Sequence, residues 1–194
     1  ESPGVLYSYT NWTELDLASI AFGHSMAVTT LQLAQAYSVI ASGGVLRHVT
    51  FQKTAGVVEG TRVLSEDVSG KLMLMLEKVV ESGGTGQRAN VPLYRVAGKT
   101  GTAHKSTSSG YAEDKYLSLF AGMAPVNSPQ LVLVVIIDEP KGGEHFGGLV
   151  AAPVFSGVMQ GALRILDVAP DKIPKMETSL LMADKHVVMQ KHTR

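Results

Sequence analysis

The sequence predicts an α+β fold in which helices pack on an antiparallel sheet. Three observations support this prediction. Helical periodicity dominates the first half, three consecutive strand-like segments occupy the second half, and one more helical pattern follows them. Hydrophobic residues make up 45% of the 194 residues and charged residues 18%, a mixture typical of a chain that buries a core.

The first half contains two amphipathic helices. The first is expected over residues 29–41, where Thr29 and Gln32 have the spacing of a capping box. Short strands are expected over 45–51 and 62–64. The second helix begins at Ser65, and its expected buried face consists of Val68, Leu72, Met75, Leu76 and Val79.

The second half predicts a meander of strands over residues 94–103, 116–124 and 130–138, with a tight turn at 127–129. The Ser/Gly-rich stretch 106–110 predicts a loop, as does the segment bracketed by the glycine pairs at 142–143 and 147–148. Pro153 opens a helix that extends to about Leu166. The inward residues of this helix are expected to be Phe155, Val158, Met159 and Leu163. We expect one domain unit over 1–170 and a polar, flexible tail over 171–194.

Composition excludes several classes of function. Lys plus Arg and Asp plus Glu both number 17, so there is no net charge to favour nucleic acid. Without cysteine, thiolate catalysis and Cys-ligated metals are excluded. No pair of the six histidines has helical ligand spacing around a carboxylate, so we expect no metal and no other cofactor. Asp138 and Glu139 suggest paired acids, but a strand that ends at Pro140 is the favoured interpretation.

The segment that carries chemistry is residues 97–103, Ala-Gly-Lys-Thr-Gly-Thr-Ala, which allows three interpretations. A phosphate-binding P-loop would need a glycine at the position of Leu93. It would also need a helix after Thr100, whereas residues 102–109 are small, polar and loop-like. An ordinary exposed edge strand is the second. The third is the Lys-Thr-Gly motif of β-lactamases and penicillin-binding proteins, on a strand that lines a cleft.

Each residue type suits such a cleft. Lys99 can hold a carboxylate and bias proton transfer near a nucleophile. Thr100 and Thr102 project from one side of a strand and can donate to the same carboxylate. Gly101 lets a peptide lie close, as an added strand. The backbone N–H of Thr102 can serve an oxyanion hole.

Further blocks distinguish these interpretations. They are Gly-Gly-Thr-Gly at 83–86, Val-Thr-Thr-Leu-Gln-Leu-Ala-Gln-Ala-Tyr at 28–37, Phe-Ala-Gly-Met-Ala-Pro at 120–125, Asp-Glu-Pro at 138–140 and Phe-Gly-Gly-Leu-Val-Ala-Ala-Pro-Val-Phe at 146–155. Together with residues 96–103 they resemble class B penicillin-binding proteins, above all the division-specific transpeptidases, over residues 1–170.

The resemblance implies part of a β-lactamase/transpeptidase-like domain and a serine peptidoglycan D,D-transpeptidase of septal synthesis. Lys99 and Thr102 would be catalytic. The substrate-binding residues would be Thr100, Gly101, Thr102, His104, Phe146 and Gly147. The partners would be stem peptides, β-lactam antibiotics and division proteins. The location would be the periplasmic face of the inner membrane, with an anchor outside this chain.

The chain has no Ser-x-x-Lys and no Ser-x-Asn, the motifs that would supply the nucleophile and its neighbours. In the family both precede the Lys-Thr-Gly strand. We therefore expect this chain to be the C-terminal half of the domain, to associate with the missing N-terminal part and to be inactive alone. A non-catalytic interaction module of the division machinery, on the same scaffold, is the alternative.

Overall fold

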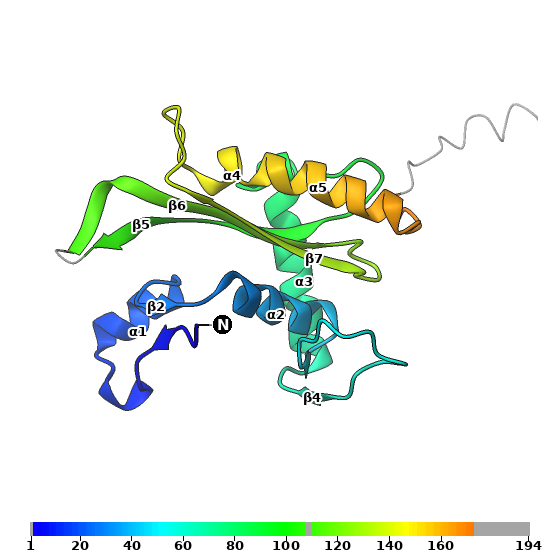
Figure 1. Ribbon diagram of the computed structural model, residues 1–194, viewed down its shortest axis with the longest axis horizontal. Coiled ribbons are helices and arrows are strands. Elements are labelled where there is room, and N and C mark those ends of the chain that lie inside the picture. Colours follow the sequence, from blue (N-terminus) through cyan, green and yellow to red (C-terminus); the bar gives the residue numbers. More distant parts are fainter. Residues whose placement is uncertain (1, 108–109, 173–194) are drawn as a thin grey trace, which may run out of the picture.

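The computed structural model describes residues 2–107 and 110–172. Its centre is an antiparallel sheet of β5 (Ala97–Thr107), β6 (Gly110–Ala124) and β7 (Leu131–Asp138), in the order β5-β6-β7. The expected α+β architecture is confirmed. Figure 1 shows α4 (Gly147–Val150) and α5 (Ala152–Ile165) above the sheet, with α1 (Glu14–Ala21) and α2 (Thr30–Ala41) below it. Helix α3 (Glu66–Val80) packs against β5.

The remaining elements are small. Strand β1 (Val5–Leu6) pairs with β2 (Met26–Ala27), and β3 (Val45–Arg47) pairs with β4 (Gly60–Arg62). The single turns η1 (Tyr9–Asn11) and η2 (Gln87–Ala89) complete the order. None of the helices within the described ranges is long and apolar enough to cross a membrane.

Local signals place the helix starts. Thr29 caps α2 as the predicted capping box. Its side chain accepts a hydrogen bond from the Gln32 N–H, and Gln32 Oε1 accepts one from the Thr29 N–H. Ser65 caps α3 by accepting from the Val68 N–H at 3.2 Å. A proline in the first turn opens α5, where the missing N–H would have no helical partner.

The core lies on both faces of the sheet. On the α5 face, Phe120 and Phe155 meet edge to face with ring centroids 4.7 Å apart, and both are fully buried. On the α2 face, Ala97 and Met123 are buried against a partly buried Tyr37. The two-sided burial explains why β6 ends in a run of buried residues and why β7 is aliphatic from Leu131 to Ile137.

Two predicted helix faces are partly wrong. Val158 of α5 is 50% exposed, and Val68 and Met75 of α3 are exposed as well. In α3 the buried stripe is rotated, because Ser69 is buried and donates a hydrogen bond to the Ile40 carbonyl of α2 at 2.8 Å. This small residue lets the two helices approach closely where a stripe of large side chains was expected.

Several predicted boundaries also move. Strand β3 stops at Arg47, and β4 covers 60–62 instead of 62–64, because Val63 and Leu64 both donate their N–H to the Gly44 carbonyl. The loop predicted over 106–110, and the loop-like character assigned to 102–109, are wrong where the structure describes them. Strand pairing continues to Thr107 opposite Gly110. The glycines 147–148 begin α4 instead of ending a loop. The predicted flexible tail lies outside the described residues from 173 onward.

Candidate functional site

Strand β5 forms one edge of the sheet in the part of the chain that the structure describes. Among the described strands it pairs with β6 alone, in a register that sets Thr100 opposite Phe120 and Thr102 opposite Ser118. Phe120 belongs to the core beneath α5, so both threonines lie on the α5 face of the sheet. Lys99, opposite Ala121, starts from the other face.

The Lys99 side chain is exposed and bends over this edge. Its Nζ donates to the Thr100 carbonyl at 2.9 Å and lies 3.4 Å from Thr100 Oγ1. Among the described residues no carboxylate pairs with it, whereas Lys105 on the same strand has two carboxylate partners. Lys99 therefore presents a positive charge to anything that approaches the edge.

The backbone of the edge is also available. Because the Thr100 carbonyl accepts from Lys99, it points away from β6. Inward and outward residues alternate along an antiparallel edge strand, so Thr102 directs its N–H outward as well. On the α5 face of the sheet, Thr102 Oγ1 accepts a hydrogen bond from the Gly147 N–H at 3.0 Å. This leaves the Thr102 hydroxyl hydrogen free to donate.

Gly147 brings the segment between β7 and α5 onto the strand. A Cβ atom at this position would overlap the carbonyl oxygens of Gly101 and Leu119, so only glycine fits. The buried Ser118 hydroxyl, opposite Thr102 on β6, donates to the His145 carbonyl. This second hydrogen bond also holds the segment before α4 against the sheet. Gly101 and Gly147, both predicted as site residues, are thus in contact.

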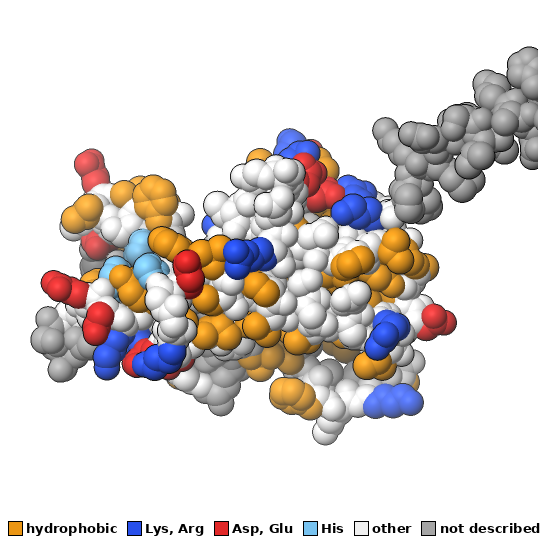
Figure 2. All heavy atoms as spheres, turned by 90° about the horizontal axis from the view of Figure 1, so that it is seen from above, with side chains coloured by type: hydrophobic (Ala, Val, Ile, Leu, Met, Phe, Trp, Pro, Cys, Tyr) orange, Lys and Arg blue, Asp and Glu red, His pale blue; other side chains and the backbone are white. Residues whose placement is uncertain are grey.

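A row of rings extends the site along the α5 face. The ring centroids of His104 and Tyr116 are 4.6 Å apart, and Tyr116 stacks on His145 with centroids 4.0 Å apart. The centroids of His145 and Phe146 are 4.5 Å apart. His104 Nδ1 is 2.8 Å from the Ala112 carbonyl oxygen. Figure 2 shows histidine side chains gathered on this face beside acidic and basic ones. The structure therefore joins the predicted residues His104 and Phe146 through two rings that the sequence did not single out.

Lys105 ties the strand to the end of β7. Its Nζ donates to Asp138 at 2.8 Å and to Glu139 at 2.9 Å. The hydrogen bond that Lys105 donates to Asp138, and then the one it donates to Glu139, raise the pKa of Lys105. The hydrogen bond from Lys105 lowers the pKa of Glu139. As expected, the strand ends at this acidic pair, and both carboxylates hold a lysine.

The segment that follows α3 also reaches the site. Thr85 Oγ1 lies 3.2 Å from Thr100 Oγ1, and a Cβ atom at Gly148 would overlap the Thr85 carbonyl oxygen. Thr85 lies within the glycine-rich block of the sequence but was not predicted as a site residue. Tyr116, Lys105 and Ser118 were missed because only the strand register reveals which residues face the motif.

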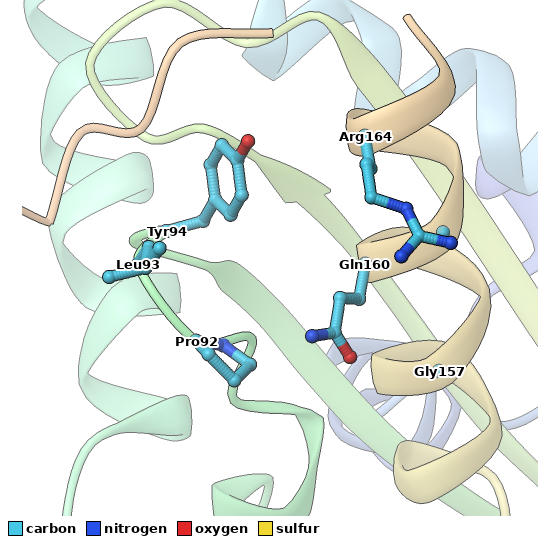
Figure 3. A pocket seen from close by; sticks show the side chains of 7 residues that line it. Pro92, Leu93, Tyr94, Gly157, Gln160 and Arg164 are labelled. Atoms are coloured by element: carbon cyan, nitrogen blue, oxygen red, sulfur yellow. The ribbon is translucent and has the colours of Figure 1, made fainter. Parts of the chain in front are cut away.

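A cavity of about 410 Å³ opens elsewhere, between residues 92–94 and one side of α5. In Figure 3 Tyr94 faces Gln160 and Arg164 across it. None of the predicted site residues lines this cavity. Within the described ranges there is also no group of three His, Asp or Glu side chains that could hold a metal ion.

An antiparallel sheet covered by helices, with a lysine and two threonines at its edge, is the arrangement that the sequence predicted for a penicillin-binding transpeptidase domain. The family described as "Penicillin binding protein transpeptidase domain" matches residues 1–160, and the chain belongs to this family.

Named relatives agree with this assignment. The chain is 44% identical over 173 residues to the probable peptidoglycan D,D-transpeptidase PbpC of Pseudomonas aeruginosa, covering 89% of this chain and 31% of that protein. It is 38% identical to the peptidoglycan D,D-transpeptidase FtsI of Escherichia coli K12, covering 89% of this chain and 29% of that protein. The chain thus spans about a third of the curated relatives that it matches.

A solved structure matches as well. The apo transpeptidase domain of Burkholderia pseudomallei penicillin-binding protein 3 has a TM-score of 0.83 and 43% identity. The match covers 89% of this chain and 53% of that one.

Proposed function

We propose that this chain forms one wall of the active site of a serine peptidoglycan D,D-transpeptidase that cross-links stem peptides during septal wall synthesis. The observation that carries the proposal is the exposed β5 edge. There Lys99, which has no carboxylate partner among the described residues, lies beside the Thr100 carbonyl and the outward N–H of Thr102. Membership of the transpeptidase family and the names of the relatives support the reaction class.

The edge suits a peptide that carries a C-terminal carboxylate. Such a peptide adds to β5 as a further strand, and the missing side chain of Gly101 lets it approach closely. Lys99 attracts the carboxylate, and the hydroxyls of Thr100 and Thr102 donate to it. His104, Phe146 and Gly147 border the bound peptide.

The reaction proceeds by acyl transfer. A serine Oγ attacks the carbonyl of the penultimate D-Ala, and the terminal D-Ala leaves with the serine's proton. The amine of a second stem peptide then attacks the ester, the acyl–Oγ bond breaks, and a proton from the amine returns to the serine Oγ. The outward N–H of Thr102 stabilises the negative charge on the carbonyl oxygen in each tetrahedral intermediate. Lys99 favours the proton transfers through its charge. β-Lactams acylate the same serine, and no cofactor takes part.

We propose that the serine comes from a preceding part of the same domain. Two observations support this: the chain lacks Ser-x-x-Lys, and it covers 53% of a solved transpeptidase domain. The first 28 residues also expose many large apolar side chains, which suits a surface that the preceding part covers. They include Val5, Leu6, Tyr7, Tyr9, Leu15, Leu17 and Phe22. The parent protein would face the periplasm from an inner-membrane anchor and bind division proteins.

Intact mass after incubation with benzylpenicillin tests this proposal. We expect a one-to-one adduct on the parent protein, none on the 194-residue chain, and much slower acylation of a Lys99→Ala parent. Lys71→Met, on the exposed face of α3, is the matched control. Absence of an adduct on the parent would instead favour a non-catalytic interaction module on the same scaffold.

A further inference from the structure

The glycine-rich segment 83–86 is closely packed at Gly84 and Gly86, which flank Thr85. The Gly86 N–H donates to the Val79 carbonyl at 2.9 Å and closes the segment on the end of α3. A Cβ at Gly84 would overlap that carbonyl oxygen, and a Cβ at Gly86 would lie 2.8 Å from the Phe120 ring. Thr85 is the exception, because its side chain is exposed.

Thr85 is held in place at the site from two sides. Its hydroxyl oxygen lies 3.2 Å from that of Thr100, and its carbonyl oxygen lies where a side chain of Gly148 would stand. Gly148 follows Gly147, whose N–H donates to Thr102. Segment 83–86, strand β5 and the start of α4 therefore meet around the hydroxyls of Thr85, Thr100 and Thr102.

The donors around Thr100 determine where its hydrogen points. A lysine ammonium only donates, so Lys99 at 3.4 Å faces a lone pair of Thr100 Oγ1. A hydroxyl has two lone pairs and one hydrogen. When Thr85 donates to the second lone pair, the Thr100 hydrogen remains for a third group. Without Thr85, that hydrogen has no fixed direction.

We propose that Thr85 is a positioning residue that donates to Thr100 Oγ1 and so aims the Thr100 hydroxyl at the carboxylate of the bound ligand. This inference rests on the proposed function, since it needs a ligand with a carboxylate at β5. It adds a hydroxyl outside the Lys-Thr-Gly strand to the recognition of that group.

The test compares two β-lactams on the parent protein: benzylpenicillin, which carries a carboxylate, and its methyl ester, which does not. Thr85→Val keeps the shape and removes the hydroxyl. We expect the acylation efficiency for benzylpenicillin to fall about tenfold, as for a weakened hydrogen bond to a charge. Efficiency for the ester should stay unchanged. Thr85→Ser should restore the reaction with benzylpenicillin, and Thr61→Val, on the exposed strand β4, should behave as wild type.

Two results would overturn the positioning role. One is benzylpenicillin acylation of Thr85→Val at the wild-type rate. The other is an equal loss for both compounds, which would indicate a structural role. Double substitution distinguishes further: Thr85→Val should add nothing to Thr100→Val, because Thr85 acts through Thr100. If the wild-type parent is not acylated by benzylpenicillin, the proposed function itself fails, which is a different result from a silent Thr85→Val.

Discussion

The amide of Gly147 donates a hydrogen bond to Thr102 Oγ1 across 3.0 Å and joins the start of α4 to the edge strand β5. The two residues are far apart in sequence, and each was predicted as part of one site. Their contact explains why the Phe-Gly-Gly block and the Lys-Thr-Gly-Thr block occur together. The first supplies a close-packed support for the second.

Gly147→Ala tests this contact. The added Cβ would overlap the carbonyl oxygens of Gly101 and Leu119, both backbone atoms that cannot rotate away. We expect a loss of about 1–3 kcal/mol in the free energy of unfolding and slower acylation of the parent by benzylpenicillin. Gly157→Ala, with no atom near the new Cβ, is the control and should stabilise α5 slightly. Equal unfolding midpoints for the two variants would contradict the packing argument.

The Lys105 cluster predicts a dependence of stability on pH. The pKa of Glu139 lies below its ordinary value of 4.5 because Lys105 donates to it. Stability from this pair is therefore complete above that value and is lost as the pH falls through the folded-state pKa. The pKa of Lys105 is raised above 10.5, so its contribution is lost only as the pH rises through the folded-state value.

Lys105→Met should therefore flatten the acid limb of the stability profile. Urea unfolding of the 194-residue chain between about pH 5 and pH 3 measures this. Lys71→Met removes an exposed pair with Asp67 within α3 and serves as the control. A Lys105→Met profile that stays parallel to that of wild type would disprove the coupling.

Tyr37 predicts an effect at alkaline pH. Burial between α2 and the sheet raises the pKa of its phenol from 10.0 to about 12. Its un-ionised form is favoured in the folded chain, so this contribution to stability is complete below pH 10.0 and is lost as the pH rises towards about 12. Ultraviolet absorbance of tyrosinate should show a late step that Tyr37→Phe removes. A titration curve that the substitution leaves unchanged would argue against this burial.

The corrected face of α5 can be tested by truncation. Leu163 is fully buried in the core beneath α5, and Leu163→Ala should cost about 2–5 kcal/mol of unfolding free energy. Val158 is 50% exposed, and Val158→Ala should cost below about 1 kcal/mol. Denaturant unfolding of the chain compares the two. Similar losses would mean that the helix buries the face expected from sequence alone.

Periodicity predicted the presence of the main helices and strands but not every buried residue. Phe155, Met159 and Leu163 are buried as predicted, while Val158 is not. All four residues fit an apolar helical stripe, and only the position of the sheet determines which of them are buried. In α3 the hydrogen bond from Ser69 to α2 selects a stripe that hydrophobicity alone does not mark.

The site shows the same division between local and long-range information. The motif of residues 99–102 and its place on a strand were readable, because residue types and spacing are local. The contacts of Thr85 with Thr100, and of Lys105 with Asp138, depend on the strand register and on helix packing. The strand also runs past residue 103 because pairing with β6 outweighs the loop-like composition of 106–107.

The open edge of β5 has a consequence for solubility. A row of outward N–H and carbonyl groups that could pair with a peptide could also pair with the same edge of another molecule, which is a route to aggregation. Two such edges would place Lys99 of each copy along one seam, whereas Lys105 already has carboxylate partners. Like charges at that seam oppose the pairing, so the cation that suits an anionic peptide also discourages self-association.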